Sequence, residues 1–209
     1  MVNDKTSIVK LHFADNELTL SADTPDAGKS EDIIDNLLVI SPDMGAMERA
    51  RYYADMLSSD VGMFYKRRDL TKIVNGKNPI VEHAYMGADV KDRNVLVVDD
   101  MIASGASMIE VGEKLRERGA KKIFFITTFS LFTEGVDVFK EAYKKKYFDK
   151  LYTTNLTYIP KAYSKCKWLH VVNCSKRIAE IIDYIHEGKS LKKIVHGNDR
   201  IIELLNKKA

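Results

Sequence analysis

The chain has 209 residues, a length that fits one domain of ordinary size with a small appendage. Hydrophobic residues make up 45%, which argues against intrinsic disorder, and the formal net charge of +3 lacks the basic excess of a nucleic-acid binder. No apolar run approaches membrane-spanning length, and the first residues lack the apolar segment of a signal peptide. Because the two cysteines, Cys166 and Cys174, cannot form a disulfide framework, we expect reduced thiols in a cytoplasmic protein.

The first 36 residues are predicted to form a β-hairpin and a linker. Apolar residues at 8–13 and 18–20 flank Asp15-Asn16, a pair typical of a tight turn. A polar segment at 21–32 follows. We therefore divide the chain into a hairpin and linker at 1–36 and a main domain at 37–209.

The main domain alternates between short apolar runs, typical of buried strands, and segments of helical spacing. The expected strands are 37–40, 61–65, 81–86 (at a sheet edge), 95–98, 122–127, 151–154 and 168–172. The expected helices are 46–57, 107–118, 136–145, 175–186 and 199–205. Such alternation favours an α/β fold with a parallel sheet.

The first strand of the main domain leads into Ser41-Pro42-Asp43-Met44-Gly45-Ala46 and then a helix. The small residues Gly45 and Ala46 let a ligand approach the backbone closely. Asp43 is placed to bind Mg²⁺ or to cap the helix, and the cap is the more common role for an Asp in this position.

Three adjacent cations, Lys66-Arg67-Arg68, follow the second strand. Such a run is usually a solvated strand end, but it also suits an anionic ligand. The polar, turn-rich residues 69–79 that come next fit a loop that orders over a substrate.

The segment 94–108 carries the most chemical information. Four apolar residues lead into Asp99 and Asp100, and a loop of small residues at 103–107 then opens a helix. At the carboxyl end of a buried strand, the two carboxylates can accept hydrogen bonds from ribose hydroxyls, directly or through Mg²⁺. The backbone N–H groups of the loop, its serine hydroxyls and the positive end of the helix can hold a phosphate. A plain strand-to-helix turn is the alternative. The predicted sugar-phosphate contacts are Asp99, Asp100, Ala103, Ser104, Gly105, Ala106 and Ser107.

This segment resembles the binding motif for 5-phosphoribosyl 1-diphosphate (PRPP), shared by type I phosphoribosyltransferases and ribose-phosphate diphosphokinases (PRPP synthetases). The segment 41–46 looks like the synthetase loop that binds pyrophosphate and, through its Asp, Mg²⁺. The triplet 66–68 looks like the Lys-Arg-Arg that opens the synthetase catalytic loop. The resemblance covers about 37–195, is closest to a divergent bacterial branch, and matches the second half of a synthetase. It departs at Ala103, where synthetases usually carry an acid.

The resemblance implies a three-layer, type I phosphoribosyltransferase-like fold with helices on both faces of a parallel sheet. It implies transfer of the diphosphoryl group of ATP to ribose 5-phosphate, giving PRPP and AMP, with Mg²⁺ as cofactor held by Asp43. Lys66 and Arg68 would be the catalytic cations, since phosphoryl-group transfer depends on neutralising developing charge. The expected ligands are ribose 5-phosphate, ATP and PRPP. A homo-oligomer is expected, with no nucleic-acid or membrane partner.

Three interpretations stay open. Synthetases have a first half that supplies part of the ATP site, so the synthetase interpretation carries the expectation of weak or absent activity in this shorter chain. A type I phosphoribosyltransferase that uses PRPP for nucleotide salvage is favoured by the length and by Ala103. A non-catalytic relative that binds ribose phosphates or regulates an intact synthetase is favoured by the absent first half.

Overall fold

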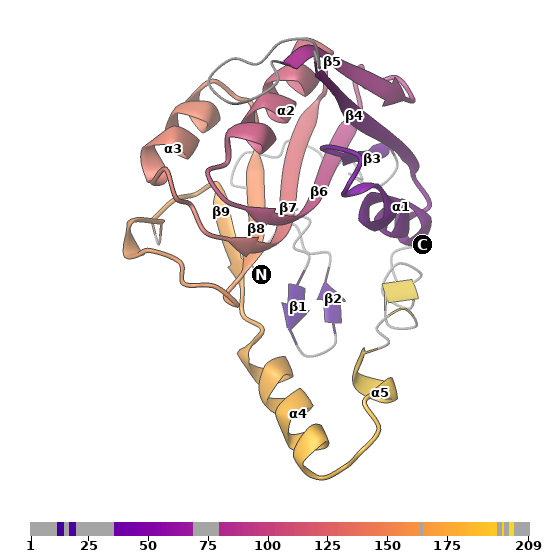
Figure 1. Ribbon diagram of the computed structural model, residues 1–209, viewed down its shortest axis with the longest axis vertical. Helices are drawn as coiled ribbons and strands as arrows, with labels where there is room; N and C mark the ends of the chain where they lie inside the picture. The colour runs from indigo at the N-terminus through magenta and orange to yellow at the C-terminus, as the bar shows by residue number, and fades with distance from the viewer. Residues whose placement is uncertain are drawn as a thin grey trace, which may run out of the picture.

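The main domain is built on a seven-stranded sheet with the strand order β5-β4-β3-β6-β7-β8-β9. This computed structural model describes residues 12–14, 17–19, 36–68, 80–163, 165–195, 198 and 201–202. The sheet strands are β3 (Leu37–Ser41), β4 (Asp60–Arg68), β5 (Ile80–Gly87), β6 (Asn94–Ile102), β7 (Lys122–Ser130), β8 (Lys150–Thr154) and β9 (Leu169–Val172). The helices are α1 (Met47–Leu57), α2 (Ala106–Glu117), α3 (Val136–Lys144), α4 (Ser175–His186) and α5 (Lys192–Val195), with a 3-10 turn at Lys161–Tyr163. Helices cover both faces of the sheet, which confirms the predicted three-layer α/β fold (Figure 1).

Six of the seven strands run parallel, and β5 lies antiparallel to β4 at one edge. The predicted edge position of this strand is confirmed, and the sheet is mostly parallel, as predicted. Antiparallel neighbours need no crossover helix between them, so β5 can pair directly with the strand that precedes it. Antiparallel edge strands on parallel sheets are common in folds of this class.

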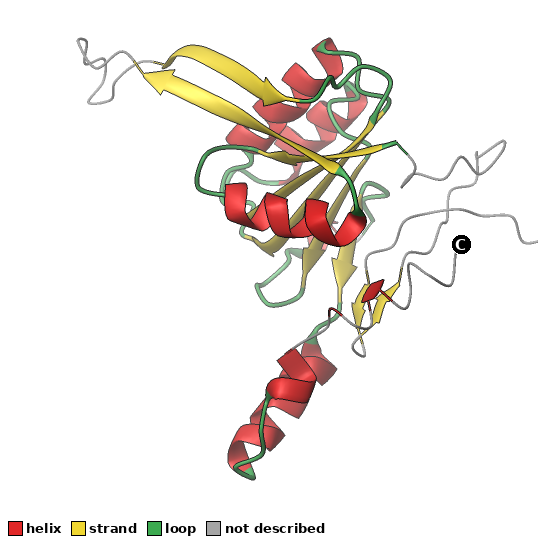
Figure 2. Ribbon diagram, turned by 90° about the vertical axis from the view of Figure 1, so that its right-hand side faces the viewer, coloured by secondary structure: helices red, strands yellow, loops and turns green. Residues whose placement is uncertain are grey.

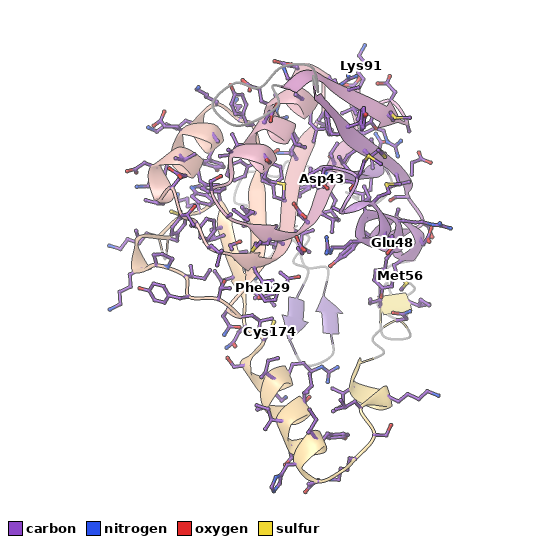
Figure 3. All side chains as sticks on the ribbon, in the orientation of Figure 1. Asp43, Glu48, Met56, Lys91, Phe129 and Cys174 are labelled. Carbon is purple, nitrogen blue, oxygen red and sulfur yellow. The ribbon has the colours of Figure 1, made fainter. Side chains whose placement is uncertain are left out.

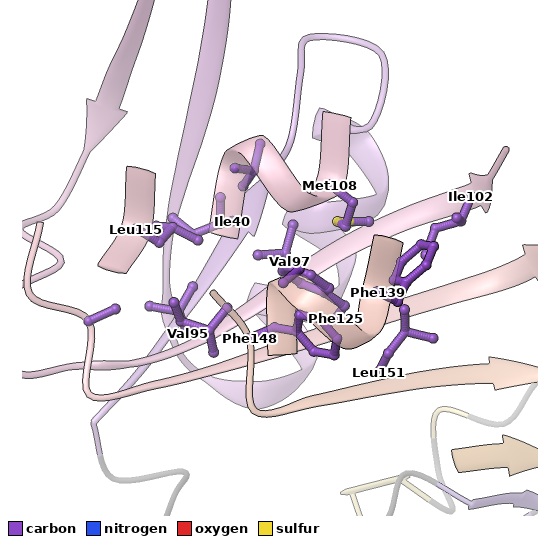
Figure 4. Packing of buried hydrophobic residues seen from close by; sticks show 14 of the residues in the cluster. Ile40, Val95, Val97, Ile102, Met108, Leu115, Phe125, Phe139, Phe148 and Leu151 are labelled. Atoms are coloured by element: carbon purple, nitrogen blue, oxygen red, sulfur yellow. The ribbon is translucent and has the colours of Figure 1, made fainter. Parts of the chain in front are cut away.

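The larger core lies between the sheet and helices α2 and α3 (Figure 4). Val95, Val97 and Phe125 point from the strands toward Met108 and Leu115 of α2. Each fully buried side chain of this size contributes roughly 1.5–3 kcal/mol by leaving water. Because alternate strand residues face opposite sides, these odd-numbered residues of β6 fix which face α2 must cover.

The opposite face holds a smaller core under α1. Ala50, Ala54 and Leu57 are buried against the residues of β3 and β6 that point away from the larger core, including Val39 and Val98. These three residues have the helical spacing that predicts a helix at 46–57, with its apolar residues on one face. α1 packs against β3, β4 and β6. It does not extend over β8 and β9, which lie further along the same face of the sheet.

One pair of strands and one helix extend from the compact body. β4 pairs with β3 only as far as Met63 and then continues with β5, so the ends of β4 and β5 form an arm that extends away from the body (Figure 2). α4 projects from the opposite end in both views, and none of its residues is buried. In the described part of the chain, no helix is both long and apolar enough to cross a lipid bilayer.

Most predicted elements appear with shifted ends. β6 and β7 run on to Ile102 and Ser130, because their ends pair with each other at Met101 with Phe129 and at Ile102 with Ser130. The two strands of the predicted hairpin are present as β1 (His12–Ala14) and β2 (Glu17–Thr19), and they pair antiparallel. The predicted terminal helix at 199–205 falls largely outside the described residues, and α5 was not predicted.

Candidate functional site

The acid pair lies at the carboxyl end of β6, between β3 and β7. Asp99 pairs with Thr127 of β7, and the backbone N–H of Asp100 donates to Asp99 Oδ1 at 2.8 Å. Both acids are therefore strand residues, rather than residues that follow the strand. The Asp99 side chain is 24% exposed and that of Asp100 is 59% exposed. The pair thus combines one partly desolvated carboxylate with one that is open to solvent.

The Asp43 turn lies beside this pair, because β3 is the direct neighbour of β6. Asp43 Oδ1 accepts hydrogen bonds from the backbone N–H groups of Gly45 (2.8 Å) and Ala46 (3.1 Å). These bonds fix the turn that leads into α1, but Asp43 is not the cap residue: the N-cap of α1 is Ala46, which makes no side-chain cap hydrogen bond. Figure 3 shows Asp43 at the start of α1, with Phe129 and Cys174 at the ends of the sheet that face α4.

The three acids influence one another electrostatically. Burial, as the largest cause, and the neighbouring negative charges of Asp100 and Asp43 together raise the pKa of Asp99 to about 6, against the lowering effect of the Asp100 N–H hydrogen bond. Burial alone disfavours the charged carboxylate. The fold therefore gathers negative charge at this edge of the sheet.

Arg49, in the first part of α1, is a site residue that the sequence analysis missed. Its Nη1 lies 3.7 Å from Asp99 Oδ1, and its Nη2 lies 3.3 Å from Asp100 Oδ2. One guanidinium thus reaches both carboxylates, although successive strand residues point in different directions. Arg49 lies in the first turn of the helix predicted at 46–57, but its contact with the acid pair depends on β3 and β6 being parallel neighbours, which the sequence does not reveal.

The loop of small residues that connects β6 to α2 is tightly packed and hydrogen-bonded. Gly105 has a φ of 91°, and a Cβ at this position would lie 2.1 Å from Cζ of Phe139 in α3. Ser104 Oγ accepts the Ala106 N–H at 3.3 Å, and Ala103 O accepts the Thr133 N–H at 3.0 Å. α2 begins at Ala106, one residue earlier than predicted, so its positive end adjoins the loop.

The predicted catalytic cations are located only in part. The backbone of Lys66 and Arg68 belongs to the β4 arm, where Lys66 pairs with His83 and Arg68 with Ile80. Their side chains, and the predicted loop at 69–79, lie outside the described residues. Placing the triplet after the strand was wrong, because pairing with β5 extends β4 through all three residues.

The chemistry of the acids suits a hard divalent cation. Carboxylate oxygens are its preferred ligands, and Mg²⁺ usually takes one or two carboxylates plus substrate phosphates. Among the described residues, no three His, Cys, Asp or Glu side chains are placed to hold a metal ion together. Asp43, Asp99 and Asp100 therefore do not form a closed protein cage, and a cation bound to one or two of them would need further ligands.

A pocket of about 240 Å³ opens next to Asp99, at the carboxyl ends of β6 to β9. Arg49 and Asp99 stand on one side of it. The remaining lining residues are uncharged, and most of them are threonines or apolar residues: Tyr53, Ile126, Thr127, Thr128, Tyr152, Thr153, Thr154, Leu156, Val172 and Cys174. Thr127 and Ser130 share a buried hydrogen bond of 3.0 Å, and Ser130 donates to Thr153 at 2.9 Å, which ties β7 to β8 beside the pocket.

Known proteins of related sequence match more than half of the chain. Residues 26–158 match the family described as "Phosphoribosyl transferase domain". A ribose-phosphate pyrophosphokinase from Ureaplasma parvum serovar 3 is 31% identical over 165 residues, which are 78% of this chain and 47% of that protein. A protein of the same name from Thermococcus kodakarensis is 43% identical over 99 residues, which are 47% of this chain and 32% of that protein.

A solved structure agrees with the fold. The phosphoribosylpyrophosphate synthetase from Mycobacterium smegmatis superposes with a TM-score of 0.59 and 23% identity, over 75% of this chain and 47% of that chain. The chain thus spans about half the length, or less, of the relatives it matches. Such coverage is consistent with the predicted likeness to one half of a PRPP synthetase. The matched residues include both acidic turns and the small-residue loop, and the chain belongs to the phosphoribosyl transferase domain family.

Proposed function

We propose that the chain carries out ribose-phosphate diphosphokinase chemistry, the transfer of the diphosphoryl group of ATP to ribose 5-phosphate to give PRPP and AMP. The observation that carries this proposal is the acid pair of β6, followed within six residues by the small-residue loop and the positive end of α2. Asp99 and Asp100 would hold the ribose hydroxyls. Residues 103–107 would hold the 5-phosphate.

The transfer itself needs positive charge near the moving group. Lys66 and Arg68 would supply it from the β4 arm, and Mg²⁺ near Asp43 would neutralise further charge when bound. The relatives named ribose-phosphate pyrophosphokinase support this assignment, and ATP, ribose 5-phosphate and PRPP are the ligands we propose.

AMP formation tests the proposal. With ATP, ribose 5-phosphate and Mg²⁺, we expect AMP at a low rate that depends on all three, and Asp100→Asn should abolish it. Lys66→Ala and Arg68→Ala should each lower kcat by about 100-fold, as for loss of one transition-state donor. Lys91→Ala, which removes a charge from the exposed turn before β6, serves as the control and should change nothing. AMP that forms equally well without ribose 5-phosphate would contradict the proposal.

One observation favours a second candidate, a type I phosphoribosyltransferase. The pocket beside Asp99 has mostly apolar and hydroxyl-bearing walls, which suit an uncharged ring such as a nucleobase. This candidate predicts that the chain consumes PRPP in the presence of adenine, guanine, hypoxanthine, uracil or orotate. Consumption with a base, and no AMP from ATP, would replace the diphosphokinase assignment.

We also propose a homo-oligomer in the cytoplasm, with no nucleic-acid partner. Ile178, Ile182 and Ile185 form an exposed apolar stripe on α4, which supports contact with another protein surface. The free thiols of Cys166 and Cys174 agree with a reducing compartment.

A further inference from the structure

Arg49 is held at the acid pair by charge more than by hydrogen bonding. Its nitrogens lie 3.7 Å and 3.3 Å from the carboxylate oxygens of Asp99 and Asp100. Charge-assisted hydrogen bonds of an arginine fork are shorter, about 2.7–2.9 Å. A loose pair of this kind can be exchanged for a competing ligand at little cost.

The position of Arg49 favours such competition. Its guanidinium faces both carboxylates, which are the groups that a sugar hydroxyl or a divalent cation would have to reach. Arg49 and Asp99 also line the same pocket, so a ligand in this pocket meets the guanidinium and one carboxylate of the pair together. A ligand that takes the carboxylate oxygens facing Arg49 therefore competes with the guanidinium for them.

The charge balance explains why a cation is needed there. Asp43 and Asp100 both raise the pKa of Asp99 through their negative charges, so the three acids repel one another. In the described part of the chain, Arg49 forms the ion pairs recorded for the two β6 acids. Without a counter-ion, this edge of the sheet would attract any divalent cation in solution.

We propose that Arg49 is an internal counter-ion that occupies the acid pair when the site is empty and that a ligand must displace. In this role Arg49 is a positioning residue: it suppresses binding of a bare divalent cation and makes the cation bind together with an anionic ligand. The released guanidinium then pairs with the anion. Occupation by cation and by anion are thereby coupled, in the sense that each raises the affinity for the other. This inference rests on the proposed function only for the identity of the anion, ribose 5-phosphate.

The claim that Arg49 suppresses binding of a bare divalent cation can be tested with Mn²⁺ and the full chain. Electron paramagnetic resonance of the free ion measures how much Mn²⁺ is bound. Arg49→Met should bind Mn²⁺ roughly tenfold more tightly than the wild type, since one contact ion pair no longer competes. Arg49→Lys, which keeps the charge, should stay within about twofold of the wild type. Asp100→Asn should abolish the binding in each background.

A matched control separates the effect of the direct Arg49 ion pairs from the effect of removing one positive charge anywhere on α1. Arg51, two residues along α1, is 75% exposed and pairs with Asp55 at 3.8 Å. Arg51→Met removes the same charge from the same helix and should leave Mn²⁺ affinity within about twofold of the wild type. Equal tightening in Arg49→Met and Arg51→Met would overturn the inference, and so would an unchanged affinity in Arg49→Met.

Added ribose 5-phosphate tests the coupling. In the wild type it should raise Mn²⁺ affinity, and in Arg49→Met this increase should disappear, because no guanidinium is released to meet the phosphate. If ribose 5-phosphate changes nothing in any protein while the tenfold difference without sugar persists, the proposed function fails and the counter-ion role stands. If ribose 5-phosphate binds and the two proteins bind Mn²⁺ equally, the counter-ion role fails alone.

Discussion

Asp99 is the residue with the least ordinary environment in the described site. It combines partial burial, a backbone hydrogen bond and two acidic neighbours, and burial is the largest cause of its raised pKa. The sequence marked Asp99 by its place after four apolar residues. The same apolar run explains the burial, because a strand that packs on both faces keeps the residue directly after its apolar run partly in the core.

The raised pKa predicts how stability depends on pH. The folded state binds the Asp99 proton more tightly than the unfolded state, whose pKa lies near 4, so the stabilising contribution is complete below pH 4 and is lost as pH rises through about 6. In EDTA, the free energy of unfolding of the wild type should fall relative to Asp99→Asn by roughly 2 kcal/mol between pH 4 and pH 7. Urea unfolding across this range measures the difference. Parallel pH profiles for the two proteins would contradict the predicted pKa.

The conformation and packing of Gly105 predict that its replacement lowers the stability of the fold. Gly105→Ala combines a positive φ with a collision against Phe139 and should lower the free energy of unfolding by roughly 2–4 kcal/mol. Gly188, after α4, has a φ of 64° and no atom within 4 Å of an added Cβ. Gly188→Ala should therefore cost only about 1 kcal/mol. Equal costs would show that packing against Phe139 is not what requires glycine in the loop.

The helices differ in how much of their surface is buried against the sheet. α2 is buried along one face, whereas α4 projects from the body with its isoleucines exposed. Both helices show clear amphipathic spacing in the sequence, which predicts that each has an apolar face but does not identify its partner. The extension of β4 through Lys66 and Arg68 was likewise hidden, because a strand that continues on an antiparallel neighbour carries polar residues.

The contrast between the two helices can be measured. Leu115→Ala in α2 removes a fully buried side chain and should lower the free energy of unfolding by about 2–5 kcal/mol. Ile182→Ala in α4, 61% exposed, should change it by no more than about 0.5 kcal/mol. Denaturant titration at low protein concentration gives both values. A loss of several kcal/mol in Ile182→Ala would mean that α4 is packed in the folded protein.

At the scale of the whole molecule, strand order assembles the site. β3 and β6 are parallel neighbours although more than fifty residues separate them, so the Asp43 turn and the acid pair meet at the carboxyl ends of these strands.

Periodicity predicted the α/β fold, most strands and the turns with their small residues. It could not predict the Arg49 ion pairs, the antiparallel β5 or the pocket, because each depends on which strands become neighbours. The Lys66 and Arg68 roles stay predictions.

The central claim is that the acid pair and the loop before α2 together bind one sugar phosphate. Calorimetric titration of the full chain with ribose 5-phosphate and Mg²⁺ tests it most directly, with Asp100→Asn as the site variant and Asp183→Asn, on the exposed face of α4, as the matched control. We expect binding in the wild type and in Asp183→Asn, and a loss of at least about tenfold in affinity in Asp100→Asn, the equivalent of about 1.4 kcal/mol. Equal affinity in all three proteins, or no binding to the wild type, would contradict the claim.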